Sequence, residues 1–150
     1  MTDEAKRRFD RIIGPLASDP AVAGMARFVQ HGRVTTLEHC LRVARLSWAI
    51  DQKLRLHSDP TALIRSALLH DFYLYDWHDK AAHPRWHGFR HARAAAMNAR
   101  AHFRVTTREM DVIRSHMWPL NLTCPPRSRE GWIVCLADKC CSLKETLFIR

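Results

Sequence analysis

The chain has no long hydrophobic run, since none of its apolar stretches approaches the ~20 residues that a transmembrane helix needs. Its N-terminus, MTDEAKRRFDRIIG, carries charges of both signs and lacks the apolar centre of a secretory signal. We therefore expect no membrane partner and a cytoplasmic location. Internal repeats and Gly/Ser-rich linkers are also missing, and a length of 150 residues suits one domain with one core, spanning residues 1–150.

Paired cysteine motifs are absent as well. The five cysteines are odd in number and no CxxC spacing occurs, which argues against a disulfide framework and against a zinc ribbon. Cys140 and Cys141 are adjacent on a predicted helix, so their side chains point in different directions and are not expected to bridge each other. We expect all five to be reduced thiols.

Positive charge and histidine are abundant. The formal net charge is +9, and arginine outnumbers lysine. Such a surplus favours anionic partners, including phosphorylated small molecules and nucleic acids. A solvated basic surface explains the charge equally well, and no basic block interleaved with aromatics indicates a nucleic-acid patch, so nucleic acid is possible but not favoured. Ten histidines give a first hint of metal or phosphate chemistry.

Helix signals dominate and period-two strand patterns are weak, so the predicted fold class is all-α. Asp-Pro pairs at 19–20 and 59–60 are typical of a cap followed by proline in the first turn, and Thr35/Glu38 and Thr106/Glu109 fit capping boxes. The stretches 72–90 and 120–127 are expected to be irregular. The predicted helices cover about residues 3–13, 20–30, 36–54, 60–71, 91–103, 107–118 and 128–148.

Several polar side chains fall on the apolar faces of these helices. His39 has Val43 one turn away on the same face, and His70, His116 and Asp138 lie in similarly apolar settings. A single buried histidine is readily satisfied by a carbonyl, but an ionised buried carboxylate needs a cation or strong hydrogen bonds. Facing helices in bundles build metal sites from such groups. Histidine with carboxylate suits Fe, Mn, Zn or Co.

The order of these residues resembles that of a known family. His39 in EHCLRVARLS, the pair His70-Asp71 in SALLHD, and Asp138 in VCLADK are similar to the H…HD…D signature of the HD phosphohydrolase superfamily. The resemblance runs from about residue 35 to 145. It implies a compact multi-helix HD-domain bundle with a central metal site. It also implies that these four residues bind a catalytic divalent metal, among which Mg is a further candidate, and that His70 and Asp71 are catalytic.

Some members of that superfamily hold two metals and supply two further histidines between the HD pair and the final Asp. His91, which opens the alanine-rich segment, and His116, in VIRSHMWP, stand at matching places. The resemblance then implies that Asp71 bridges the two ions. His87 is the rival to His91, and it is equally compatible with substrate contact or solvation. One or two ions are therefore expected.

The sequence departs from the family where a lysine that binds phosphate usually follows the HD pair. Here Phe72, Tyr73 and Leu74 come next, and the lysine is missing. Arginine matches phosphate bidentately, and histidine or another lysine could also replace the missing cation. Spacing does not choose among the candidates, which are His78, His83, Arg85, Arg90 and Lys139. The residues that we expect to bind substrate are Arg85, His87, Arg90 and Lys139.

The implied activity is metal-dependent hydrolysis of a small phosphorylated compound or nucleotide by a metal-activated water. Two alternatives stay open: a di-iron oxygenase, because the two-metal branch of the superfamily contains such enzymes, and a non-catalytic domain that binds a nucleotide or RNA. Coincidence of buried polar residues is disfavoured because four signature positions occur in order. The sequence predicts no oligomeric state.

Overall fold

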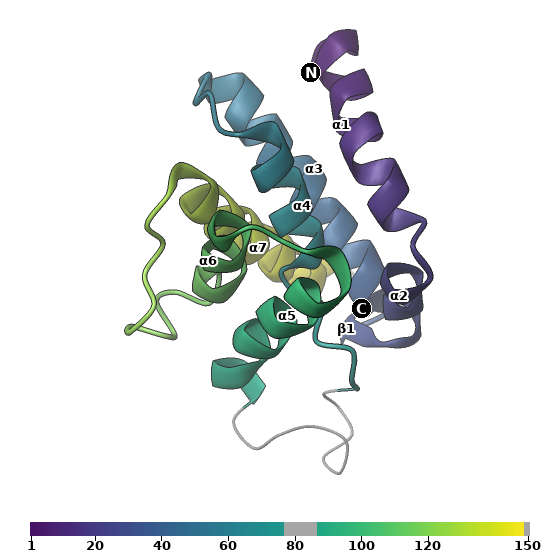
Figure 1. Ribbon diagram of the computed structural model, residues 1–150. Helices are drawn as coiled ribbons and strands as arrows, with labels where there is room; N and C mark the ends of the chain where they lie inside the picture. The colour runs from purple at the N-terminus through teal and green to yellow at the C-terminus, as the bar shows by residue number, and fades with distance from the viewer. Residues whose placement is uncertain (77–86, 149–150) are drawn as a thin grey trace.

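The computed structural model describes residues 1–76 and 87–148, most of which are helical. Helices dominate the view in Figure 1, which confirms the predicted all-α class, although a short hairpin is added. Strands β1 (Val29–His31) and β2 (Val34–Thr35) form that hairpin, and a 3-10 turn, η1 (Gly24–Arg27), precedes it. The α-helices are α1 (Asp3–Ala17), α2 (Pro20–Ala23), α3 (Thr36–Leu54), α4 (Pro60–Leu69), α5 (His87–Phe103), α6 (Thr107–Ser115) and α7 (Arg129–Phe148).

Local capping fixes the starts of the helices that carry the site. The Thr35 hydroxyl accepts a hydrogen bond from the Glu38 amide at 3.2 Å, and the Glu38 carboxylate accepts one from the Thr35 amide at 2.9 Å. Thr106 and Glu109 form the same reciprocal pair at the start of α6. Both predicted capping boxes are therefore confirmed, and they satisfy amides that a helix start leaves unpaired.

The predicted helix over 20–30 is wrong beyond its first turn. Its Asp19 cap is present, but α2 ends at Ala23 and the chain passes through η1 into the hairpin. The Thr36 amide donates to the Phe28 carbonyl at 2.8 Å, and β1 pairs antiparallel with β2. Gly32, with φ of 58°, makes the tight reversal. Pairing across the hairpin replaces the helical hydrogen bonds.

Three other predicted boundaries also shift. The first helix continues through Pro15 to Ala17, α5 begins at His87 within the stretch expected to be irregular, and α6 ends at Ser115. After α6 the Trp118 amide donates to the Ser115 carbonyl at 3.1 Å, so turns replace the helix well before Pro119. Helix ends are set by such local competition among hydrogen bonds, which sequence patterns locate only approximately.

Helices α3 and α4 lie side by side at the centre, and their facing residues form the core (Figure 1). Trp48 on α3 and Leu63, Ile64 and Leu68 on α4 are almost fully buried. The Trp48 indole donates to the Ala5 carbonyl at 2.9 Å, which ties α1 to this pair. No helix within the described ranges is long and apolar enough to span a bilayer.

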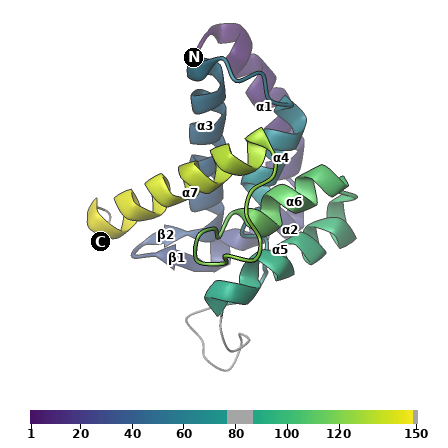
Figure 2. The same cartoon turned by 90° about the vertical axis from the view of Figure 1, so that its left-hand side faces the viewer.

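Helix α7 crosses the central pair, while α5 and α6 pack against each other beside α4 (Figure 2). All five cysteines are free, and the adjacent pair points in different directions, with Cys140 exposed and Cys141 buried. This arrangement brings four segments toward the first turns of α3: the C-terminal end of α4, the N-terminal part of α5, the C-terminal end of α6 and the middle of α7.

Candidate metal centre

Six side chains from five helical segments converge on one buried point. Helix α3 supplies one, the end of α4 supplies two adjacent ones, and α5, the end of α6, and α7 supply one each. All are buried, with at most 8% of any residue exposed. They are the six residues that the sequence resemblance singled out as ligands: His39, His70, Asp71, His91, His116 and Asp138.

The first group surrounds one oxygen of each aspartate. His39 Nε2 lies 3.1 Å from Asp138 Oδ1 and 3.9 Å from Asp71 Oδ2. His70 Nε2 lies 3.4 Å from Asp71 Oδ2 and 3.6 Å from Asp138 Oδ1. Two nitrogens and two oxygens thus face a common space, with separations that an ion between them would bridge.

The second group surrounds the other oxygen of Asp71. His91 Nε2 lies 3.3 Å and His116 Nε2 lies 3.5 Å from Asp71 Oδ1. The two imidazole nitrogens are 3.0 Å apart. The carboxylate of Asp71 therefore separates the cluster into two sets of ligand atoms, one on each oxygen.

Hydrogen bonds on the far side of three rings orient them toward the centre. His70 Nδ1 donates to the Ala67 carbonyl at 2.8 Å, and His116 Nδ1 donates to the Ile113 carbonyl at 2.7 Å. His39 Nδ1 lies 2.8 Å from a carboxylate oxygen of Glu145. Partners of this kind fix the tautomer of a ligand histidine and leave Nε2 available to a metal.

Two buried polar atoms at the centre make no hydrogen bond within the described part of the chain: His70 Nε2 and Asp71 Oδ1. A buried polar atom without a partner costs about 1–3 kcal/mol. A divalent cation within each group of ligand atoms would satisfy one of the two. Three overlapping triplets of these residues have ligand atoms within 4.8 Å of one another and could hold a metal ion.

Burial and neighbouring charges shift the pKa values of the cluster, and these influences cross between the two groups. Burial opposes the charged form of His39, but hydrogen bonds to Asp138 and Glu145 outweigh it and raise the pKa to about 10. Burial likewise opposes ionisation of Asp71, yet the charge of His70 and the nearby imidazole of His91 hold its pKa well below the usual range. Burial, followed by repulsion from His70, lowers the pKa of His116 to about 3.

Three residues that support the cluster were not expected from the sequence, namely Glu145, Gln30 and Tyr73. Glu145 accepts from His39 and pairs with Arg42 at 3.1 Å. Gln30 in the hairpin donates to Asp71 Oδ2 at 2.6 Å, and the Tyr73 hydroxyl donates to the Gln30 amide oxygen at 2.6 Å. Glu145 had a usable signal, since it follows the final aspartate by two helical turns on the same face. Gln30 had none, because a long-range contact places it.

A cavity of about 610 Å³ opens beside the cluster, and Asp71, His91, His116 and Asp138 lie in its wall. Of the four predicted substrate-binding residues, Lys139 also lines this cavity, and its ammonium donates to the His116 carbonyl at 2.9 Å. Arg90 is exposed and lines a different hollow. Arg85 and the side chain of His87 lie outside the described residues, as do His78 and His83.

A helical bundle whose facing helices present buried histidines and aspartates to one another defines a candidate metalloprotein. A family model described as HD domain matches residues 36–143, most of the chain. The chain therefore belongs to the HD domain family, whose members are commonly metal-dependent phosphohydrolases. No curated protein and no solved structure gives a significant match to it.

Proposed function

We propose that this protein is a metal-dependent phosphohydrolase that acts on a small phosphorylated compound or nucleotide. The observation that supports it best is the division of the Asp71 oxygens between two sets of ligand atoms. One set would hold a first ion and the other set a second, and Asp71 would contribute an oxygen to each. The first set is His39, His70, Asp71 and Asp138, and the second is Asp71, His91 and His116.

A divalent ion at such a site lowers the pKa of water toward neutrality and offsets charge on the phosphoryl oxygens. The protein supplies the remaining functions. Glu145 and the carbonyls behind His70 and His116 hold the imidazoles in place. Lys139 stands in the cavity wall and would take the role of the missing family lysine by exchanging its longer contacts with Cys135, at 3.3 and 3.4 Å, for a phosphate oxygen.

A di-iron oxygenase is the second candidate, and the cavity gives a specific reason for it. Among the described lining residues, Lys139 is the one lysine or arginine, while Met117, Pro119 and Leu120 form an apolar wall. A pocket with little positive charge also suits an organic substrate without phosphate. A nucleotide- or RNA-binding domain without catalysis ranks third, because it would leave the ligand atoms at the centre without a role.

The deciding experiment measures metal per chain by elemental mass spectrometry on untagged protein. The variant is Asp71→Asn, and the matched control is Asp51→Asn. Asp51 is also buried, but it lies outside the cluster and accepts a hydrogen bond from the Ser58 amide at 3.0 Å. We expect one or two equivalents in the wild type and the control and a loss in Asp71→Asn. Two equivalents support the six-ligand site and one supports the four-ligand site.

Activity then separates the two enzymatic candidates. Release of inorganic phosphate from a panel of phosphomonoesters and nucleotides, lost in Asp71→Asn and kept in Asp51→Asn, supports the phosphohydrolase. Oxygen uptake by the iron-loaded protein with an organic substrate, without phosphate release, supports the oxygenase. No bound metal after reloading with Fe, Mn, Zn, Co or Mg would refute both.

A further inference from the structure

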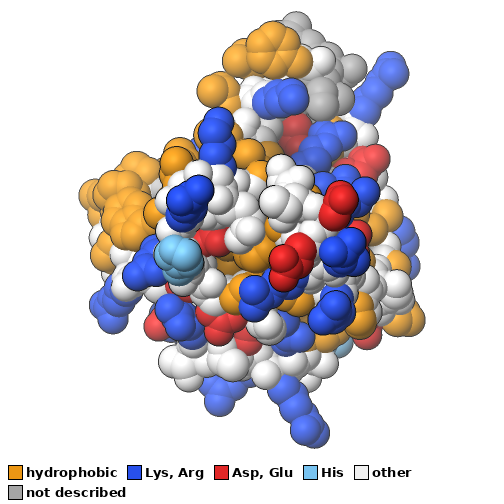
Figure 3. All heavy atoms as spheres, turned by 90° about the horizontal axis from the view of Figure 1, so that it is seen from above, with side chains coloured by type: hydrophobic (Ala, Val, Ile, Leu, Met, Phe, Trp, Pro, Cys, Tyr) orange, Lys and Arg blue, Asp and Glu red, His pale blue; other side chains and the backbone are white. Residues whose placement is uncertain are grey.

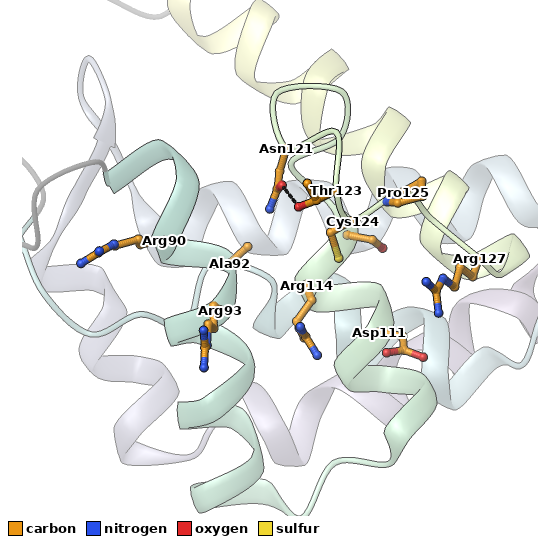
Figure 4. Close-up of a pocket in the computed structure, with 11 residues that line it drawn as sticks. Arg90, Ala92, Arg93, Asp111, Arg114, Asn121, Thr123, Cys124, Pro125 and Arg127 are labelled. Atoms are coloured by element: carbon orange, nitrogen blue, oxygen red, sulfur yellow. Dashed lines mark hydrogen bonds between the residues drawn. The ribbon is translucent and has the colours of Figure 1, made fainter.

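A second hollow lies on the outer side of the bundle, away from the metal cluster. It measures about 380 Å³ and is bounded by α5, α6 and the segment 121–127 (Figure 4). Its charged lining residues are Arg90, Arg93, Arg114 and Arg127 together with one acid, Asp111. In the close-up, Arg93 and Arg114 point to the same side of the hollow, and Arg90 points away from the other three.

The positive charge of this hollow is left largely uncompensated. Within the described part of the chain, none of the four arginines has a carboxylate partner within ion-pair distance, and Asp111 offsets only one of them. All four arginines are exposed, and a bound anion would offset their like charges. The Thr123 hydroxyl donates to the Asn121 amide oxygen at 2.8 Å, which leaves the amide nitrogen of Asn121 as a further donor to a ligand.

We propose that this hollow is a second ligand site, which binds a phosphate chain, either free polyphosphate or the phosphates of a nucleotide. Arginine matches phosphate oxygens bidentately, and the volume falls in the range of small-ligand pockets. The same two helices present His91 and His116 on their inner faces. An anion held between α5 and α6 would therefore also join the helices that carry the second set of ligands.

The test uses metal-free protein in the presence of EDTA, so that it does not depend on the function proposed for the metal centre. Binding of inorganic tripolyphosphate and of ATP is measured by calorimetry at low salt. The variant is Arg114→Gln/Arg127→Gln. The matched control is Arg7→Gln/Arg11→Gln, which removes the same charge from an exposed face of α1.

We expect the pocket variant to bind tripolyphosphate at least about tenfold more weakly than the wild type, because it loses two guanidiniums that can pair with phosphate oxygens. The control should stay within about twofold. If ATP and tripolyphosphate bind with equal affinity, the phosphate chain alone is the ligand. If ATP binds more tightly than tripolyphosphate, the ligand is a nucleotide. Equal losses in both variants, or no binding to the wild type, would overturn the proposal.

A different observation concerns α7. Trp132, Leu136, Leu143 and Leu147 are between 49% and 63% exposed, and Cys140 is exposed among them. These five residues follow one another along the helix at intervals of four, four, three and four positions. Seen down the helix axis, they therefore lie within an arc of about 80°. Figure 2 shows the C-terminal half of α7 running out beyond the other helices. Figure 3, which views the molecule from above, shows hydrophobic side chains gathered on parts of its outline and basic side chains over much of the remaining surface.

The spacing of this stripe is almost symmetric about the middle of the helix. A second copy of α7 laid antiparallel on the first sets Trp132 opposite Leu147 and Leu136 opposite Leu143, with the two Cys140 residues near the two-fold axis. Exposed side chains of this size and their neighbours would bury on the order of 1,000 Å² in total, enough for a specific though weak dimer. In a two-fold symmetric dimer both copies use the same surface, so this one face of α7 is sufficient to form it.

We infer that two copies of the chain associate through this face of α7. In sedimentation experiments, the full chain should form a dimer that Leu136→Glu/Leu143→Glu abolishes and Leu54→Glu leaves intact, since Leu54 is equally exposed but lies on α3. A short bismaleimide should link the wild type into covalent dimers and fail to link Cys140→Ser. A wild type that stays monomeric at all concentrations, or crosslinks that persist in Cys140→Ser, would contradict the inference.

Discussion

Replacing Glu145 by glutamine should weaken metal binding without touching a ligand. The Glu145 carboxylate accepts from His39 Nδ1 at 2.8 Å and is held by Arg42 at 3.1 Å. Glutamine keeps the size of the side chain but loses its charge and turns one oxygen into a donor. Second partners of ligand histidines typically contribute 10–100-fold to metal affinity, which corresponds to about 1.4–2.8 kcal/mol.

The chain offers a closely matched control in Glu130. It lies on the same helix, is equally buried, accepts from the Asp59 amide at 2.8 Å and pairs with Arg108 at 3.2 Å. Glu130→Gln should therefore lose a similar amount of folding stability while its metal affinity stays at the wild-type value. The comparison separates the orientation of His39 from a general loss of stability.

The assay is competition for metal against a chelating dye, with urea unfolding of the metal-free proteins beside it. We expect the affinity of Glu145→Gln to fall 10–100-fold and that of Glu130→Gln to change by less than about twofold. Wild-type affinity in Glu145→Gln, or equal losses in both variants, would refute the argument that Glu145 acts through His39.

Further predictions concern stoichiometry, pH and packing. His91→Ala should keep one of two metal equivalents, whereas Asp71→Asn should lose both, and a complete loss in His91→Ala would contradict the division at Asp71. The pKa of His39 is raised from 6.5 to about 10, so its contribution to the stability of the metal-free protein is complete below pH 6.5 and fades as the pH rises toward 10. Because a bound metal must displace the His39 proton, metal affinity should rise by up to about tenfold per pH unit in that window. Calorimetry in buffers of different ionisation enthalpy measures the protons released, and binding without proton release would contradict this prediction. Leu68→Ala in the core should cost about 2–5 kcal/mol in urea unfolding, against less than about 0.5 kcal/mol for the exposed Leu54→Ala, and similar costs would show that the core is misplaced.

The sequence alone determined the elements that rest on local chemistry. The capping boxes at Thr35 and Thr106 place the starts of α3 and α6, because each is closed by hydrogen bonds within four residues. Helical periodicity put Asp138 on an inward face, where a carboxylate requires a partner. The resemblance to the HD signature then implied a set of six ligand side chains, and the structure brings all six together.

Tertiary structure decided what depends on residues far apart in the chain. The hairpin at 29–35 overrode a helix signal because its hydrogen bonds run between strands, and it delivers Gln30 to Asp71 across 41 positions. Packing also separated two positively charged residues that spacing left equivalent. Lys139 lines the cavity at the cluster, whereas Arg90 lies at the rim of the outer hollow. Local patterns determine which face of a helix is buried, but only the packing of helices against one another determines which residues that face contacts.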